Sequence, residues 1–264
     1  MTIMALHTAA TGINYQSKNI DVIANNIANA TTNGFKAQRL HGEDLFYLEL
    51  QQVGQAAEGG RPAPLQLGLG VRPTSTSRNF LQGSLIETNQ PLDMAIEGQG
   101  FFRVQTPPDI GNGFAYTRDG HFNVDSDGTV VTADGYRLDP PIDIPADAVQ
   151  IQIQPNGLVN IHRPGGVVEQ QGPIQLTNFV NPSGMVAQGQ NLFVESEASG
   201  PPVGPNDPLT NGLGKLQQGY LEASNVEIVT EVVELIKSQR AFEFNSQTIQ
   251  ASDQALSVIA NLRR

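Results

Sequence analysis

The stretch Ser224-Asn-Val-Glu-Ile-Val-Thr-Glu-Val-Val-Glu-Leu-Ile-Lys-Ser-Gln-Arg-Ala-Phe-Glu243 lies in a run, Tyr220 to Arg264, that contains neither glycine nor proline. Apolar residues recur in this run every seven positions, at Ile228, Leu235, Phe242, Ile249 and Leu256. Such spacing, with further apolar residues three or four positions away, predicts a long helix that packs lengthwise on other helices. At about 1.5 Å per residue the helix would be roughly 60 Å long, so we expect it to need partners beyond its own domain.

A second stripe with the same spacing lies in the first 34 residues, at Leu6, Ile13, Ile20 and Ile27. Asn33-Gly34 offers the residue with positive φ that commonly closes a helix. Three asparagines crowd the last turns, although asparagine is a poor helix former. We expect the amides of Asn25, Asn26 and Asn29 to have hydrogen-bond partners, with ordinary fraying of the helix end as the alternative.

The prolines separate these two ends from a turn-rich middle, because all 17 lie between Pro62 and Pro208. From Val71 to Leu209, short alternating runs separated by turn pairs such as Asn156-Gly157 are typical of a β-rich domain. Residues 35–70 begin as an extended segment or a short helix and continue as a loop or long hairpin. Near the C-terminal helix, Ser224 and Glu227 have the spacing of a capping box.

The formal charge of −11 at pH 7 belongs to the middle of the chain, because the two ends are nearly balanced. An acidic surface disfavours nucleic acid and anionic membranes as partners. The absence of cysteine excludes disulfides and thiolate metal sites. We expect no membrane insertion, since no segment approaches the roughly 18 apolar residues of a membrane span. The N-terminus also lacks the pattern of a cleaved secretory signal.

Catalytic motifs are weak. The chain contains no GxSxG, P-loop or HExxH pattern, and we expect neither a catalytic site nor a cofactor. Asn123-Val-Asp-Ser-Asp-Gly128 mimics the start of a calcium-binding loop, but a β-turn rich in Asx residues explains it without metal. The remaining enzymatic alternative acts on periplasmic polysaccharide, with Asp119, Asp125 and Asp127 as candidates, although no spacing identifies a carboxylate pair.

Each predicted helix also carries apolar residues away from its stripe, among them Val22 and Ile23 at one end and Val229, Val233 and Ile236 at the other. A helix with more than one apolar face requires more than one neighbour. The pattern therefore favours a bundle of several subunits over a hairpin within one chain. A membrane-surface helix is excluded because the polar faces lack an excess of lysine and arginine.

Several motifs resemble those of bacterial flagellar rod and hook proteins. Ala24-Asn-Asn-Ile-Ala-Asn29 followed by Thr32-Asn-Gly-Phe-Lys36 is similar to their N-terminal signature, and Ser224 to Glu243 is similar to their C-terminal signature. The segments Ile96-Glu-Gly-Gln-Gly-Phe-Phe-Arg103 and Tyr116-Thr-Arg-Asp-Gly-His-Phe-Asn-Val124 resemble parts of the middle. The resemblance covers essentially the whole chain. The chain length and the stretch from 47 to 73 favour the distal rod, with a proximal rod or hook-type axial protein as the alternative.

This resemblance implies an α+β fold in three parts. Helical coiled-coil arms, residues 1–34 and 222–264, would pair as an inner-tube domain called D0. A β-rich outer domain, D1, would span 71–209, and residues 35–70 and 210–221 would form an extended connecting region. The implied product is a rigid hollow drive shaft that polymerises helically, transmits torque from motor to hook and forms part of the export channel.

The resemblance also implies partners and a location. The partners are other copies of the chain, the proximal rod proteins, the hook protein, the surrounding P- and L-ring proteins and the flagellar export apparatus. The implied location is the basal body, in a rod spanning the periplasm, after type III export without a cleaved signal peptide.

Two sets of residues are the candidate sites. The predicted subunit interface consists of Leu6, Ile13, Ile20, Asn25, Asn26, Ile27, Asn29, Phe35, Ile228, Leu235, Phe242, Ile249 and Leu256. We expect the asparagines to make hydrogen bonds between subunits. A stretch expected to wedge between neighbours and keep the tube straight contains Leu48, Leu50, Pro62, Leu65, Leu67 and Leu69.

Overall fold

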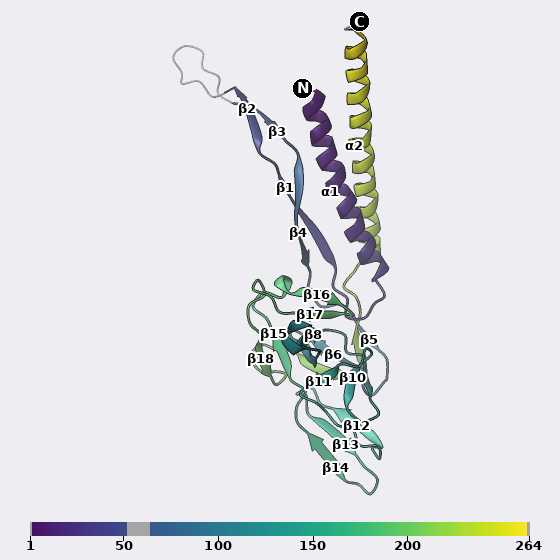
Figure 1. Cartoon of the computed structure of the whole chain (residues 1–264). Coiled ribbons are helices and arrows are strands. Elements are labelled where there is room, and N and C mark those ends of the chain that lie inside the picture. Colours follow the sequence, from purple (N-terminus) through teal and green to yellow (C-terminus); the bar gives the residue numbers. More distant parts are fainter. Residues whose placement is uncertain (1, 52–63, 263–264) are drawn as a thin grey trace. The chain divides into compact units, whose positions relative to one another are not determined.

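A computed structural model describes residues 2–51 and 64–262 (Figure 1). The chain forms two compact units. The first contains Met1–Ala28, Gln38–Ser77 and Glu227–Arg264, and the second contains Asn29–Ala37 and Arg78–Val226. The polypeptide therefore passes from one unit to the other four times.

The first unit contains the two predicted helices, α1 (Thr2–Ala28) and α2 (Ile228–Leu262), packed side by side. Figure 1 shows them running in opposite directions. Strand β1 (Gln38–Asp44) pairs with β4 (Val71–Arg78), and β2 (Tyr47–Gln51) pairs antiparallel with β3 (Leu65–Gly68). Of the two alternatives for the start of the connecting region, the extended segment is therefore correct. Neither helix, among the described residues, offers an apolar run long enough for a membrane crossing.

The turn after α1 has the chemistry that its sequence predicts. Gly34 has a φ of +68°, and a Cβ built there would lie 2.7 Å from the backbone nitrogen of Asp119. Only glycine adopts this conformation without strain and also allows such a close approach of the backbone. The helix itself ends earlier, at Ala28, so Asn33-Gly34 forms a turn in the segment that follows α1 and, contrary to the prediction, does not close the helix.

The start of α2 differs from the capping-box prediction. The hydroxyl of Ser224 accepts a bond from the backbone of Val226, and the helix begins only at Ile228. The cause lies in Asn225, whose side chain accepts a bond from the backbone N–H of Ala37 and donates to the backbone oxygens of Asn79 and Leu81. These bonds tie Asn225 to other segments, so the chain stays extended for several more residues.

The second unit is built around a sheet that has nine strands in the part of the chain described. Across the sheet their order is β16 (Val186–Gly189), β17 (Leu192–Val194), β8 (Phe114–Thr117), β7 (Phe101–Gln105), β11 (Arg137–Asp139), β10 (Val130–Thr132) and β9 (Phe122–Val124). β15 (Leu176–Asn178) pairs with β7 and with β18 (Val203–Asn206). Two short 3-10 turns accompany these strands, Gly111–Gly113 and Pro182–Gly184.

Both faces of this sheet are covered, as the central strand β7 shows. Side chains alternate along a strand, and here Phe102 and Val104 enter the main apolar core. Phe101 enters a second, aromatic cluster with Tyr116, Phe179, Met185 and Phe193. This arrangement explains why Phe101 and Phe102 are both large and apolar, although they are neighbours on one strand.

Smaller sheets complete the second unit. β12 (Gln150–Ile153), β13 (Val159–His162) and β14 (Val168–Gln171) form one sheet, β6 (Met94–Glu97) pairs with β19 (Lys215–Gln218), and β5 (Leu85–Glu87) pairs with β20 (Tyr220–Glu222). The segment that mimics a calcium loop is a turn between β9 and β10, in which Gly128 donates to the backbone oxygen of Asp125. The side chain of Asp125 accepts a bond from the backbone N–H of Ser126, the next residue.

Candidate subunit interface

The two helices of the first unit meet along a seam of small and polar residues. A Cβ built on Gly12 would lie 2.8 Å from the side-chain nitrogen of Asn245. Seven residues further along α1 and seven back along α2, Asn19 donates a 2.8 Å hydrogen bond to Ser238. After one more such step, Asn26 donates a 3.2 Å bond to Glu231. Polar contacts at heptad spacing thus specify the antiparallel register, a role that buried polar residues have in coiled coils.

The predicted apolar stripes border this seam instead of forming its centre. Leu6, Ile13, Ile20 and Ile27 on α1 and Leu235, Ile249 and Leu256 on α2 are half-buried. Phe242 is 37% exposed and Ile228 is 50% exposed. Part of each stripe therefore covers the partner helix of the same chain, and part remains in contact with solvent.

A second apolar face of α2 is open. Val229 is 73% exposed and Phe244 is 64% exposed, and Val233, Ile236 and Val258 are also exposed. At about 100° per residue, these side chains lie roughly opposite Glu231, Ser238 and Asn245, which face α1. We call Val229, Val233, Ile236, Phe244 and Val258 the outer face of α2.

One polar cluster fixes the end of the helix pair in the first unit. The buried carboxamide of Asn26 donates to the backbone oxygen of Gln38 at 2.8 Å and accepts from its backbone N–H at 2.9 Å. The buried carboxylate of Glu231 accepts two bonds from the guanidinium of Arg39, at 2.8 and 2.5 Å. We call these four residues the Asn26 cluster. It joins α1, β1 and α2.

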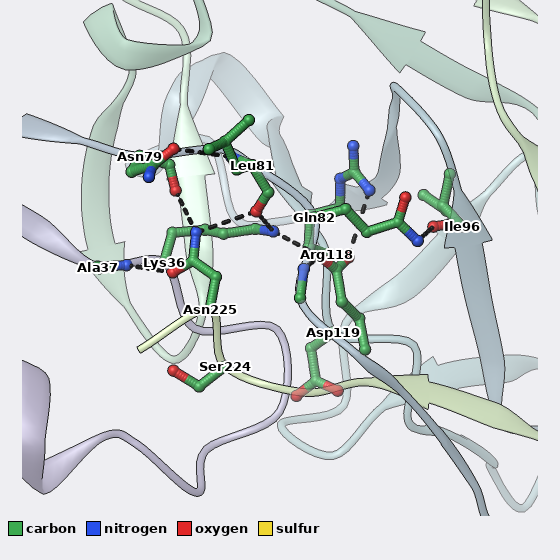
Figure 2. A network of polar contacts seen from close by, with 12 residues as sticks. Lys36, Ala37, Asn79, Leu81, Gln82, Ile96, Arg118, Asp119, Ser224 and Asn225 are labelled. Atoms are coloured by element: carbon green, nitrogen blue, oxygen red, sulfur yellow. Dashed lines mark hydrogen bonds and ion pairs between the residues drawn. The ribbon is translucent and has the colours of Figure 1, made fainter. Parts of the chain in front are cut away.

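A second cluster of charged side chains lies in the second unit and is almost completely buried. Glu222 accepts a bond from Lys36 Nζ at 2.5 Å and from Arg118 Nη1 at 3.3 Å, and the Lys36 and Glu222 side chains are 0% exposed. Lys36 also donates to the backbone oxygen of Leu81 (Figure 2). Arg118 donates to the backbone oxygen of Gly98. We call Lys36, Arg118 and Glu222 the Glu222 cluster.

Charge in the Glu222 cluster is not balanced, since two cations share one carboxylate. Burial lowers the pKa of Lys36, the Glu222 carboxylate opposes that shift, and the Arg118 charge adds to it. Burial also lowers the pKa of Arg118. Its guanidinium carbon lies 5.2 Å from the ring centroid of Phe101, and this cation–π contact partly offsets the loss of hydration.

The predicted asparagines have different environments. Asn26 bonds to Gln38 and Glu231 of its own chain, so the expectation of a partner for this amide is confirmed, and these partners are intramolecular. Asn29 accepts a bond from the hydroxyl of Thr32, and Asn25 is exposed. For Asn25 and Asn29, hydrogen bonds between subunits stay a prediction. Phe35 is half-buried, and its backbone oxygen accepts from Asn225.

The stretch expected to keep the tube straight lies mainly on the β2–β3 pair. Leu48 is 45% exposed and Leu65 is 50% exposed, whereas Leu67 and Leu69 are half-buried. Pro62 and the side chain of Leu50 lie outside the described residues. Leu67 helps to line a hollow with small residues of α1, including Ala5 and Ala9.

Sequence reasoning missed the ionic members of both clusters. Two signals could have revealed them: Glu231 takes a seam position seven residues before Ser238, and the motifs around Lys36 and Glu222 place charges beside apolar residues.

The enzymatic alternative gains no support from its three candidate aspartates. Asp125 and Asp127 are exposed in the β9–β10 turn. Asp119 accepts bonds from the backbone of His121 and the side chain of Asn191. Burial raises the pKa of Asp119, whereas these bonds oppose the shift.

Family comparisons agree along the chain. Residues 6–36 match the family "Flagella basal body rod protein", residues 95–161 match "Flagellar hook protein FlgE/F/G D1 domain", and residues 217–262 match "Flagellar basal body rod FlgEFG protein C-terminal". These segments contain most of α1, the core strand β7 and the whole of α2.

Individual relatives are similar over nearly their whole length. The flagellar basal-body rod protein FlgG of Buchnera aphidicola subsp. Schizaphis graminum is 44% identical over 263 residues, covering 98% of this chain and 100% of that protein. FlgG of Caulobacter vibrioides is 43% identical over 267 residues, covering 99% and 100%. FlgG of Bacillus subtilis is 37% identical over 270 residues, again covering 99% and 100%. This chain belongs to the FlgG family of flagellar basal-body rod proteins and is a structural, non-enzymatic subunit of the basal-body rod.

Proposed function

We propose that this chain polymerises helically into the distal rod, a rigid hollow drive shaft that crosses the periplasm and transmits torque from motor to hook. The observation that carries the proposal is the outer face of α2, which is apolar, exposed and roughly opposite the seam with α1. Burying one large apolar side chain contributes about 1.5–3 kcal/mol. A face of five such residues therefore supplies a substantial part of the free energy that association requires.

The arms and the β-rich region would take different places in this rod. In our proposal, residues 1–34 and 222–264 form the inner coiled-coil domain, D0, and residues 71–209 form the outer domain, D1. Residues 35–70 and 210–221 would connect them. The heptad spacing of the contacts between α1 and α2 supports the coiled-coil part of this proposal.

We further propose that the stretch containing Leu48, Leu65, Leu67 and Leu69 wedges between neighbouring subunits and prevents the tube from bending. The exposed apolar side chains of Leu48 and Leu65 support this role, because they would gain from contact with a neighbour. Deleting residues 47–64 should then give curved tubes in electron micrographs. Straight tubes from the deletion variant would remove this role from the stretch.

Interactions with the rest of the flagellum belong to the same proposal. The proximal rod proteins and the hook protein would adjoin the two ends of the distal rod, and the P- and L-ring proteins would surround it. The lumen would form part of the export channel. Export through the flagellar type III apparatus would leave α1 uncleaved, so N-terminal sequencing of the assembled protein should begin ahead of Leu6. A mature N-terminus beyond α1 would contradict this route.

A charge on the outer face of α2 tests the assembly directly. Val233→Asp should abolish sedimentable polymers of the purified full-length chain while leaving its helix content unchanged. Val168→Asp is the matched control, because Val168 is similarly exposed but lies on β14 in the second unit. Equal assembly of both variants would refute the role of α2.

A further inference from the structure

The outer face of α2 contains Arg240 among its apolar residues. Arg240 lies four residues from Ile236 and four from Phe244, so the three side chains share one side of the helix. Arg240 pairs with Glu243 at 2.9 Å, and both side chains are more than half exposed. Exposed pairs of this kind contribute little stability. Arg240 can therefore exchange this partner for another carboxylate at low cost.

The surface of α1 that faces away from α2 has the opposite character. Ala10, Ser17 and Ala24 are exposed and lie seven residues apart. Asp21, the sole acidic residue in the sequence of α1, is exposed on the same side of the helix. Large apolar side chains fit against small ones on a facing helix because the two backbones can then approach closely.

We propose that the outer face of α2 in one copy docks on the Ala10, Ser17 and Ala24 side of α1 in a second copy, with Arg240 paired to Asp21. This inference rests on the proposed helical assembly and names the two surfaces that meet. The surfaces complement each other in size and in charge. Because they are different patches of one chain, the contact is heterologous and repeats from copy to copy, which generates an open helical array.

The competing arrangement places the outer face of α2 against the same face of a second copy. That contact is isologous and closes a dimer instead of building a rod. This symmetric contact also places the Arg240 side chains of both copies in one interface, and α1 supplies no carboxylate there to pair with them. The heterologous contact avoids both problems.

A charge exchange tests the proposed pair. We expect Asp21→Arg and Arg240→Glu each to raise the protein concentration needed for polymer formation at least tenfold, measured by sedimentation of the full-length chain. Copies carrying both substitutions should assemble near the wild-type concentration, because the pair is restored with reversed sign. Arg137→Glu is the control, since Arg137 is also exposed and pairs with a carboxylate, that of Asp127, but lies on β11 in the second unit. It should assemble like the wild type.

Cross-linking tests directly whether residues 21 and 240 of two copies lie close together in the polymer. The chain has no cysteine, so Asp21→Cys copies mixed with Arg240→Cys copies should form a disulfide between two chains under mild oxidation, and each variant alone should not. Normal assembly of the single charge variants, no rescue in the double variant, or no mixed disulfide within wild-type-like polymers would overturn the pairing. Failure of the wild-type chain to polymerise at all would instead refute the proposed function, and the pairing with it.

Discussion

Replacing Glu222 with glutamine removes the carboxylate that joins two buried cations. Lys36 and Glu222 are fully buried and Arg118 is 5% exposed, so water cannot replace the lost charge. Breaking a buried ion pair from one side costs about 3–5 kcal/mol, because the partner is left buried and uncompensated. For a domain of this size each kcal/mol corresponds to roughly 2–4 °C in Tm. We therefore expect Glu222→Gln to lower the Tm of the second unit by about 6–20 °C.

The pH dependence of the free energy of unfolding tests whether the buried charge of Lys36 causes this loss of stability. The pKa of Lys36 lies below its usual value of 10.5 because of burial, and Glu222 partly opposes this shift. Between the folded-state pKa and 10.5, the unfolded chain binds more protons than the native chain, so the free energy of unfolding rises with pH. Without Glu222 the pKa of Lys36 falls further and this window widens. The difference in the free energy of unfolding between the wild type and Glu222→Gln should therefore become smaller between pH 7 and pH 10.

Urea unfolding of the full-length chain at several pH values measures both effects. Glu87→Gln is the matched control, because Glu87 is exposed on β5, the strand that pairs with the strand of Glu222. Lys36→Met combined with Glu222→Gln should be less destabilised than Glu222→Gln alone, since one of the two buried cations is gone. A deficit that is the same at all pH values, or no larger than that of Glu87→Gln, would refute the account of an unbalanced buried cluster.

Two further substitutions test the helix seam. Asn26→Ala removes the two bonds that its carboxamide makes with the backbone of Gln38 and should cost about 2–4 kcal/mol, measured by thermal loss of the helix signal. Asn14→Ala, at an exposed position of the same helix, should change this signal far less, and equal effects would contradict the assignment. Gly12→Leu places a side chain where a Cβ alone comes within 2.8 Å of Asn245, so overpacking should cost about 1–3 kcal/mol in the same assay. Asn14→Leu on the exposed side is its control, and a seam that tolerates both leucines equally would argue against the register.

Periodicity and turn chemistry predicted much of the fold. The absence of glycine and proline after Tyr220 predicted α2, because helix geometry depends on local residue types. Asn33-Gly34 predicted a turn after α1, but the helix ends at Ala28, before this turn. The start of α2 escaped prediction, because the bonds of Asn225 to residues 37, 79 and 81 are made by segments far apart in sequence. Local patterns cannot reveal such contacts.

The candidate interface was predicted in outline but not in its polar detail. Apolar spacing located both helices and the surplus residues Val229, Val233 and Ile236. It did not show that Asn19, Asn26, Ser238 and Glu231 face the partner helix, since hydrophobic periodicity is insensitive to a seam made by small and polar side chains. The Glu222 cluster likewise required three separate motifs to meet in space.

Electron microscopy of the purified full-length chain, concentrated until it polymerises, tests the central claim most directly. The outer face of α2 predicts straight hollow tubes with helices lining the lumen. A stable globular monomer at all concentrations, with that face exposed to solvent, would contradict the account.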